Sequence, residues 1–142
     1  MASIMYNYGK GEILNGNVDW VSDTIKLGLT STTSAYTPDP DHHFPGSASG
    51  PAASEASGTG YSRKALANKA VNVNDTDDRA EADADDVTWT GLDCGTITYA
   101  FVYKEVNDDS DSPLICCLDF ADLVTNGGDV TLQFASAGLF YI

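Results

Sequence analysis

Short segments in which apolar and polar residues alternate recur along the chain, and they constrain its fold more than any other feature. In residues 24–30 the side chains of Ile25, Leu27 and Leu29 point to one side of an extended backbone. The same period of two returns in four later segments, residues 69–74, 80–85, 96–104 and 130–134. Helical periodicity is scarce, and the many Gly, Asn, Asp, Ser and Thr residues favour turns and caps over helix interiors. The pattern therefore predicts a series of short β-strands joined by turns.

Several of the expected strands have distinct characters. Residues 114–120 are apolar on both faces, which predicts a central strand that is covered on both sides. Residues 80–85 alternate alanine with acidic residues, which predicts an edge strand whose charged face discourages aggregation. Residues 96–104 carry a stripe of large side chains and are the strongest candidate for a core strand. Residues 61–66 predict a further strand.

Two stretches depart from the clear strand pattern. Residues 31–60 consist mainly of Ser, Thr, Ala, Pro and Gly, and they predict a long surface loop with a short helical turn near residues 38–44. Residues 4–14 alternate tyrosine with other residues and are followed by an Asn-Gly turn signal. We expect this N-terminal segment to form a strand or an extended arm.

Seven or eight short strands with turn signals between them predict an all-β fold, either a β-sandwich or a barrel. The strands do not alternate with helices, which argues against a doubly wound α/β fold. A chain of 142 residues fits one domain and can bury a core without disulfides. We therefore expect a single β domain over residues 1–142, with a long surface loop at about 31–60 and an extended N-terminal segment.

Acidic residues outnumber basic ones by 21 to 7, and the formal net charge is −14. Such a surface repels phosphate backbones and anionic membranes, so we expect no nucleic acid and no membrane as partners. Charge of one sign also favours solubility, so assembly needs specific contacts or a basic patch on a partner. The first residues lack the pattern of a signal peptide, and no stretch has the length of a membrane span. These features predict synthesis and folding in a cytoplasm.

Catalytic motifs fail at identifiable positions. A P-loop that ends in the Gly9-Lys10 pair would need glycine where Ile4 stands. Residues 46–50 have the glycine spacing of a nucleophile elbow, but Ala48 occupies the place of the serine. With 21 acidic residues, pairs of carboxylates are expected by chance and indicate no hydrolase. We therefore predict that the chain is not an enzyme and has no catalytic residue and no cofactor.

Metal-binding patterns are weak as well. His42 and His43 are adjacent, and adjacent side chains of an extended chain point apart, so we expect a polar loop here. An EF-hand over residues 75–86 would place Ala80 where glycine is required, and a looser cation site between turns is the alternative. The cysteines lack zinc-ligand spacing and are expected to be reduced and buried. They are Cys94, Cys116 and Cys117. We predict no metal site.

Large apolar and aromatic side chains stand near both ends of the sequence, where polar residues are usual. They are Tyr6, Tyr8, Leu139, Phe140, Tyr141 and Ile142. These side chains either complete the sheet of the domain or contact a neighbouring subunit or shell, since interfaces favour aromatic residues. We name the six residues as candidate subunit or shell contacts.

Three segments, taken together, resemble a known group of proteins. They are residues 8–16, residues 23–30 with the sequence Asp-Thr-Ile-Lys-Leu-Gly-Leu-Thr, and residues 83–89 with the sequence Asp-Ala-Asp-Asp-Val-Thr-Trp. A tyrosine-rich strand and a Ser-Pro-Leu-Ile segment follow in the same order, at residues 98–104 and 112–115. The combination resembles small proteins encoded in tailed-bacteriophage genomes, although residues 47–57 depart from it. That group has no catalytic motif, so no functional residues are carried over.

The resemblance implies a virion structural protein that is made in the cytoplasm of the host bacterium. The implied role is capsid decoration, or cementing, through binding to the major capsid protein or another virion protein. We expect a homo-oligomer and favour a trimer. A tail, neck or receptor-binding component is the first alternative, with the loop at 31–60 contacting a host surface. A carbohydrate-binding β-sandwich module or small hydrolase is the second, with Trp20, Trp89 and Tyr61 stacking on sugars.

Overall fold

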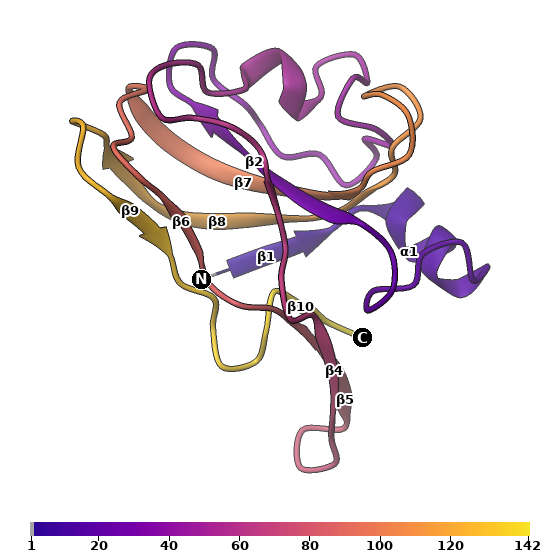
Figure 1. Ribbon diagram of the computed structural model, residues 1–142. Coiled ribbons are helices and arrows are strands. Elements are labelled where there is room, and N and C mark those ends of the chain that lie inside the picture. Colours follow the sequence, from indigo (N-terminus) through magenta and orange to yellow (C-terminus); the bar gives the residue numbers. More distant parts are fainter. Residues whose placement is uncertain (1) are drawn as a thin grey trace.

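Strands dominate the computed structural model of the chain, which describes residues 2–142 (Figure 1). Strands hold 39% of the residues and helices 9%, and the sheets are antiparallel, so the predicted all-β fold class is confirmed. The strands are β1 (Ala2–Met5), β2 (Ile25–Ser31), β3 (Lys64–Ala65), β4 (Ala70–Asn74), β5 (Arg79–Asp83), β6 (Val87–Trp89), β7 (Thr96–Lys104), β8 (Leu114–Val124), β9 (Val130–Leu132) and β10 (Phe140–Tyr141). The helical elements are α1 (Asn7–Leu14) and the 3₁₀-helix η1 (Pro51–Ser54). Within residues 2–142, no helix has the length and apolar character needed to cross a membrane.

The main sheet has five antiparallel strands in the order β1-β8-β7-β2-β3. β8 lies between β1 and β7, and residues 114–118 are all buried, which confirms the central strand predicted there. One face of this sheet shares a buried core with the smaller strands, including Trp89 of β6 and Leu132 of β9. The other face carries a second buried cluster that contains Tyr36 and Phe101. Both faces of the main sheet are therefore covered.

The loop predicted at 31–60 connects β2 to β3 and is packed on the main sheet (Figure 1). Tyr36 is buried in the second cluster, and the N–H of Ala56 donates to a carbonyl oxygen of β2 over 2.8 Å. The prediction of a helical turn near residues 38–44 is wrong, because this stretch forms non-helical turns. The helical turn of the loop is instead η1, which begins with Pro51, a residue favoured at the first helical position.

The N-terminal segment differs from the strand or extended arm predicted for residues 4–14. β1 is followed directly by α1, which packs against β8. Gly9 allows this close approach, since a Cβ at its position would lie 2.8 Å from the Cα of Ile115. The alternation of Tyr6 and Tyr8 is misleading here, because Tyr6 is the last extended residue before the helix and Tyr8 belongs to its first turn.

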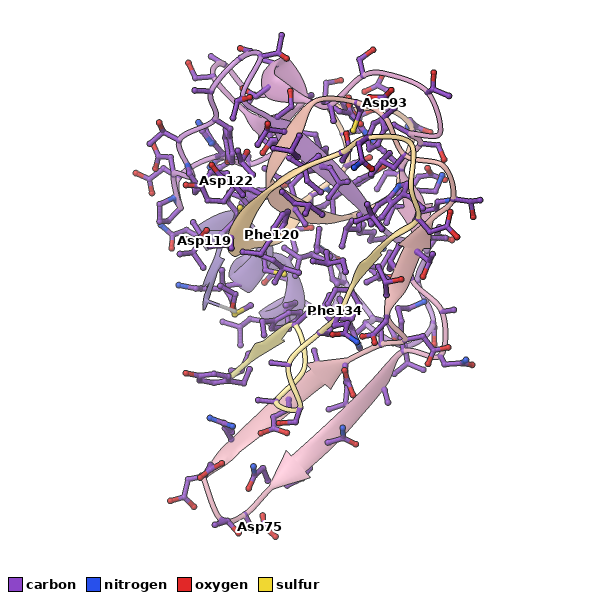
Figure 2. All side chains as sticks on the ribbon, turned by 90° about the vertical axis from the view of Figure 1, so that its left-hand side faces the viewer. Asp75, Asp93, Asp119, Phe120, Asp122 and Phe134 are labelled. Carbon is purple, nitrogen blue, oxygen red and sulfur yellow. The ribbon has the colours of Figure 1, made fainter. Side chains whose placement is uncertain are left out.

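Two smaller sheets complete the fold, with the strand orders β10-β5-β4 and β6-β9. The β4–β5 hairpin projects away from the rest of the domain, with Asp75 at its tip (Figures 1 and 2). The edge position predicted for residues 80–85 is wrong, because the C-terminal strand β10 pairs with the outer side of β5. Next to β10, Ile142 and Ala80 exchange two backbone hydrogen bonds of 2.9 Å. The edge strand of this sheet is therefore β4.

Candidate functional site

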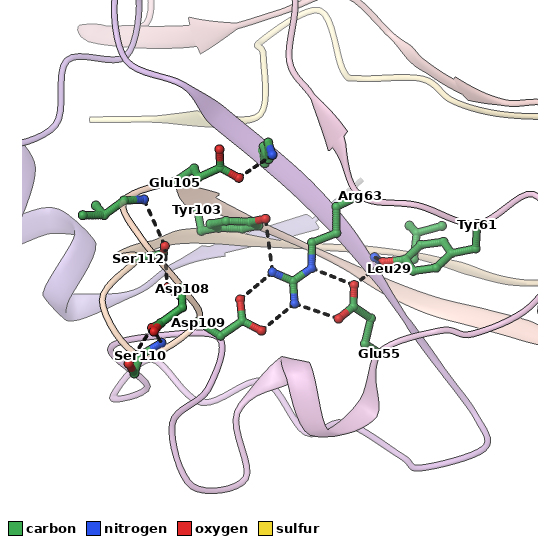
Figure 3. Close-up of polar contacts among 12 residues, drawn as sticks. Leu29, Glu55, Tyr61, Arg63, Tyr103, Glu105, Asp108, Asp109, Ser110 and Ser112 are labelled. Atoms are coloured by element: carbon green, nitrogen blue, oxygen red, sulfur yellow. Dashed lines mark hydrogen bonds and ion pairs between the residues drawn. The ribbon is translucent and has the colours of Figure 1, made fainter.

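Arg63 joins three parts of the fold through its guanidinium group (Figure 3). Its Nε and Nη2 atoms donate to the two carboxylate oxygens of Glu55 in the long loop, each over 2.7 Å. Nη1 and Nη2 also donate to the carboxylate of Asp109, in the turn between β7 and β8, over 2.5 and 2.8 Å. The guanidinium carbon lies 5.2 Å from the ring centroids of both Phe101 and Tyr103. The long loop and the β7–β8 turn are thus tied to the main sheet.

The groups around Arg63 are paired with one another. Tyr61 donates its hydroxyl hydrogen to Glu55 over 2.7 Å and accepts the backbone N–H of Leu29 over 3.0 Å. Burial, together with Glu55, raises the pKa of Tyr61 above its ordinary value. The hydrogen bonds that Arg63 donates to Glu55, and then to Asp109, raise its pKa against the opposing effect of burial. Because each charged group has an opposite partner, we interpret this cluster as a structural contact.

The three cysteine thiols are free and buried, as predicted. Burial raises the pKa of the Cys117 thiol to about 12. Burial also raises the pKa of Cys116 well above its ordinary value. Since the thiolate is the nucleophilic form, both side chains are poorly reactive at neutral pH.

The two histidines take part in aromatic contacts of the long loop. Nδ1 of His42 lies 3.2 Å from the hydroxyl oxygen of Tyr36. The ring of His43 stacks on Tyr8, with 4.6 Å between the ring centroids. Among residues 2–142, no three or more His, Cys, Asp or Glu side chains gather as they would around a metal ion. The histidines therefore serve the packing of the loop against α1 and the second cluster.

The six terminal side chains named as candidate contacts fall into different environments. Three of them are buried and complete the core, namely Tyr6, Leu139 and Phe140. Their burial corrects the expectation, because a partner could touch these side chains only if the domain opened. Tyr8 is half-buried beside His43. Tyr141 and Ile142 are exposed and are open to a partner.

Exposed apolar side chains gather at one end of the molecule. Nine large hydrophobic residues of the described chain are exposed, and five of them lie on or beside the β4–β5 hairpin. These five are Leu14, Val71, Val73, Tyr141 and Ile142. We call the area that they form the hairpin surface. Clustered exposed apolar groups are typical of interaction sites, whereas isolated ones are common on any protein surface.

Two hollows lie on the hairpin surface. The larger has a volume of about 450 Å³ and lies between α1, the hairpin and the C-terminal residues, with Trp20, Val71 and Phe140 in its lining. The smaller has a volume of about 290 Å³, contains Leu14 and shares Ile142 with the first. In the part of the chain that the structure describes, every buried side-chain nitrogen or oxygen atom has a hydrogen-bond partner. Most of the residues that line the two hollows are apolar, so the hollows are suited to apolar side chains of a partner.

The exposure of the hairpin valines was not foreseen from the sequence. The alternating pattern puts Val71 and Val73 on one face of a strand, but it gives no sign that both are exposed. A signal was present in the partner strand, where Val71 pairs with Ala82 and Val73 with Ala80. Two alanines opposite two valines make a thin layer, which cannot bury the valines without a further element.

Comparisons with known proteins leave the surface as the main guide to function. No protein-family model matches the chain, and no curated protein and no solved structure matches it. The function is therefore inferred from the sequence pattern, the charge and the hairpin surface.

Proposed function

We propose that this chain is a structural protein of a tailed-bacteriophage virion, and that it decorates the outside of the capsid shell and stabilises it. The observation that carries the proposal is the hairpin surface, where exposed apolar side chains gather at one end of an otherwise acidic domain. A decoration protein needs one adhesive end and a charged remainder that stays in solution. The resemblance of residues 23–30 and 83–89 to small phage proteins supports the same role.

The charge of the chain supports a position outside the shell. A net charge of −14 repels the packaged nucleic acid. Repulsion between free copies also limits aggregation before assembly. The major capsid protein, or another virion protein, would then supply the basic and apolar groups that complement the hairpin surface.

Binding to assembled shells tests the proposal. Added to purified shells that lack it, the protein is expected to co-sediment with them and to raise the temperature at which they disrupt, because a ligand of the intact shell stabilises it. Free capsid subunits are expected to bind little. Electron cryo-microscopy of the source particle is expected to show the domain on the outer surface. Absence of the chain from purified virions would overturn the proposal.

Two alternative functions receive less support from the structure. A receptor-binding role would use the loop at 31–60, but this loop is held on the sheet through Tyr36 and Glu55. The same cryo-microscopy map would place the chain on the shell or on the tail. A carbohydrate-binding role would use Trp20 and Trp89, which are both buried in the core. A negative glycan array would remove this alternative.

The assembly state is a separate part of the proposal. We favour a homotrimer on the shell, in which each copy contacts the capsid through its hairpin surface. Native mass spectrometry of the isolated protein, compared with the stoichiometry seen on particles, measures whether the trimer forms before or during binding.

A further inference from the structure

Strand β4 is an unguarded edge. Within residues 2–142, β5 is its only paired neighbour, and the outer side of β4 faces no other strand. Edge strands of soluble proteins are usually guarded by a charge, a proline or a bulge. The sequence of β4, Ala-Val-Asn-Val-Asn, contains neither a charge nor a proline, and its pairing with β5 is regular throughout. β4 therefore offers a row of backbone N–H and C=O groups to a further strand.

The two faces of the β4–β5 hairpin differ in chemistry. One face is apolar and reaches the larger hollow, and its residues are Val71, Val73, Ala80 and Ala82. The other face is polar, with the asparagines of β4 opposite Arg79 and Glu81 of β5. Since successive side chains of a strand point to opposite faces, a strand added beside β4 would need alternating apolar and polar residues.

The hairpin also carries an excess of negative charge. Residues 69–85 contain six acidic and two basic residues. One of the basic residues, Arg79, is already paired with Asp77 over 3.3 Å and with Glu81 over 2.8 Å. Its guanidinium carbon lies 4.4 Å from the centroid of the Tyr141 ring. The remaining acidic residues lie at the turn and at the base of the hairpin, where they would attract basic side chains of an added strand.

We propose that β4 binds an extended segment of a partner protein by strand addition, and that this segment alternates apolar residues with lysine or arginine. Its apolar side chains lie beside Val71 and Val73, on the face that lines the larger hollow, while its basic side chains lie on the polar face. Backbone hydrogen bonds to β4 supply affinity, and the alternating side chains supply selectivity. The inference rests on the proposed function only for the identity of the partner, which is the capsid shell protein.

A second copy of this chain is a poorer occupant of the same edge. Pairing two β4 strands would bring two acidic hairpins side by side, and like charges on neighbouring strands are destabilising. The β4 sequence also lacks the lysine or arginine that would complement the polar face. Charge therefore favours a basic partner over self-association through this edge.

A peptide titration tests the inference without the shell. The probe is a short blocked peptide of sequence Thr-Val-Lys-Val-Lys-Val-Thr, and the control peptide has glutamate in place of lysine. In NMR spectra of the whole protein, the lysine peptide is expected to slow hydrogen exchange of β4 amides and to shift their resonances. The glutamate peptide is expected to do neither. Shifts spread over the acidic surface without protection of β4 would overturn the inference.

Paired variants separate the apolar face from general charge attraction. The double variant Val71→Thr/Val73→Thr keeps charge and shape, and it is expected to weaken binding of the lysine peptide by about fivefold or more. The matched control is Val106→Thr/Val124→Thr, since these valines are 48% and 69% exposed against 52% and 77% for Val71 and Val73. The control is expected to bind like the wild type. Equal binding by both double variants would contradict the proposal. Slowed hydrogen exchange of the β4 amides when the protein concentration is raised without peptide would also contradict it.

Assembled shells distinguish failure of this inference from failure of the proposed function. If the wild type and Val71→Thr/Val73→Thr co-sediment with shells equally well, the chain is a shell protein but β4 is not its docking strand. If the wild type does not bind shells while the lysine peptide protects β4, the decoration role is wrong, but β4 still binds an extended segment of a different partner.

Discussion

At the scale of single residues, Arg63 connects segments that are distant in the sequence. It lies 8 residues from Glu55 and 46 residues from Asp109, and it makes two hydrogen bonds to each carboxylate. The planar guanidinium suits this arrangement because its N–H groups match carboxylates in pairs. The same group lies near the rings of Phe101 and Tyr103, which lock its position. One side chain thus holds the long loop and the β7–β8 turn on the sheet.

Replacing Arg63 is expected to destabilise the domain. In Arg63→Met, Glu55 and Asp109 lose their shared cation and repel each other, and the free energy of unfolding should fall by about 2–4 kcal/mol. The control is Lys26→Met, whose ion pair with Glu105 is more exposed and should cost less than about 1 kcal/mol. Urea unfolding measures both. Equal losses in the two variants would contradict the role given to Arg63.

The carboxylate of Asp19 is expected to contribute stability that depends on pH. It accepts the backbone N–H of Ser22 over 3.1 Å and that of Val21 over 3.0 Å, and these bonds lower its pKa below the ordinary value of 3.8. A pKa that is lower in the folded state than in the unfolded state stabilises the fold at pH values above the unfolded-state pKa. This contribution is lost as the pH falls through the folded-state pKa. The melting temperature of the wild type should therefore exceed that of Asp19→Asn near neutral pH, and the gap should close below pH 3.8.

Removal of one negative charge also changes the general repulsion in this acidic chain, so a second variant is needed. Asp75→Asn removes a carboxylate at the exposed tip of the hairpin (Figure 2). The difference between the two variants isolates the hydrogen-bonded carboxylate. A gap that stays constant from neutral to acid pH would contradict the assignment.

At the scale of elements, the contact between α1 and β8 depends on a glycine. In Gly9→Ala the new methyl group would meet the carbonyl oxygen of Leu114 and would lie 2.8 Å from the Cα of Ile115, so the helix must shift. The expected loss of stability is about 1–3 kcal/mol. A Cβ added at Gly11 in the same helix would meet no atom within 4 Å, so Gly11→Ala is the matched control. It should stabilise by about 0.5–1 kcal/mol, because alanine loses less backbone entropy.

Chemical denaturation of the two glycine variants checks this prediction, and opposite signs are expected. Destabilisation by both substitutions would mean that the helix tolerates no change, whereas stabilisation by both would mean that α1 does not press on β8.

At the scale of the whole molecule, charge opposes the compact state. With a formal net charge of −14, the folded chain concentrates carboxylates that repel one another. Salt screens such repulsion over about 10 Å at 0.1 M ionic strength. The melting temperature should therefore rise when sodium chloride is increased from about 0.01 M to about 0.5 M. Calorimetry at fixed pH measures the rise, and a fall would show that the ion pairs outweigh the repulsion.

Much of the sheet could be predicted from the sequence because strand alternation is a local property. The predicted segments 24–30 and 96–104 correspond to β2 and β7, and the apolar run at 114–118 lies in the central strand β8. The candidate site was harder to predict. Tyr141 and Ile142 could be named because apolar chain ends are unusual. The exposure of Val71 and Val73 could not, because it depends on whether another element of the fold covers that face of the hairpin.

The all-β character, the turns and the acidic surface follow from the sequence alone, because they depend on neighbouring residues and on composition. The replacement of an extended arm by α1 depends on a tertiary contact, since Gly9 packs on residues of β8 that lie more than a hundred positions later in the chain. Tertiary pairing also decided which strand is an edge. The C-terminal strand β10 covers β5 and leaves β4 open, and the same pairing buries Leu139 and Phe140. These contacts join segments that are distant in the sequence, and no local pattern encodes them.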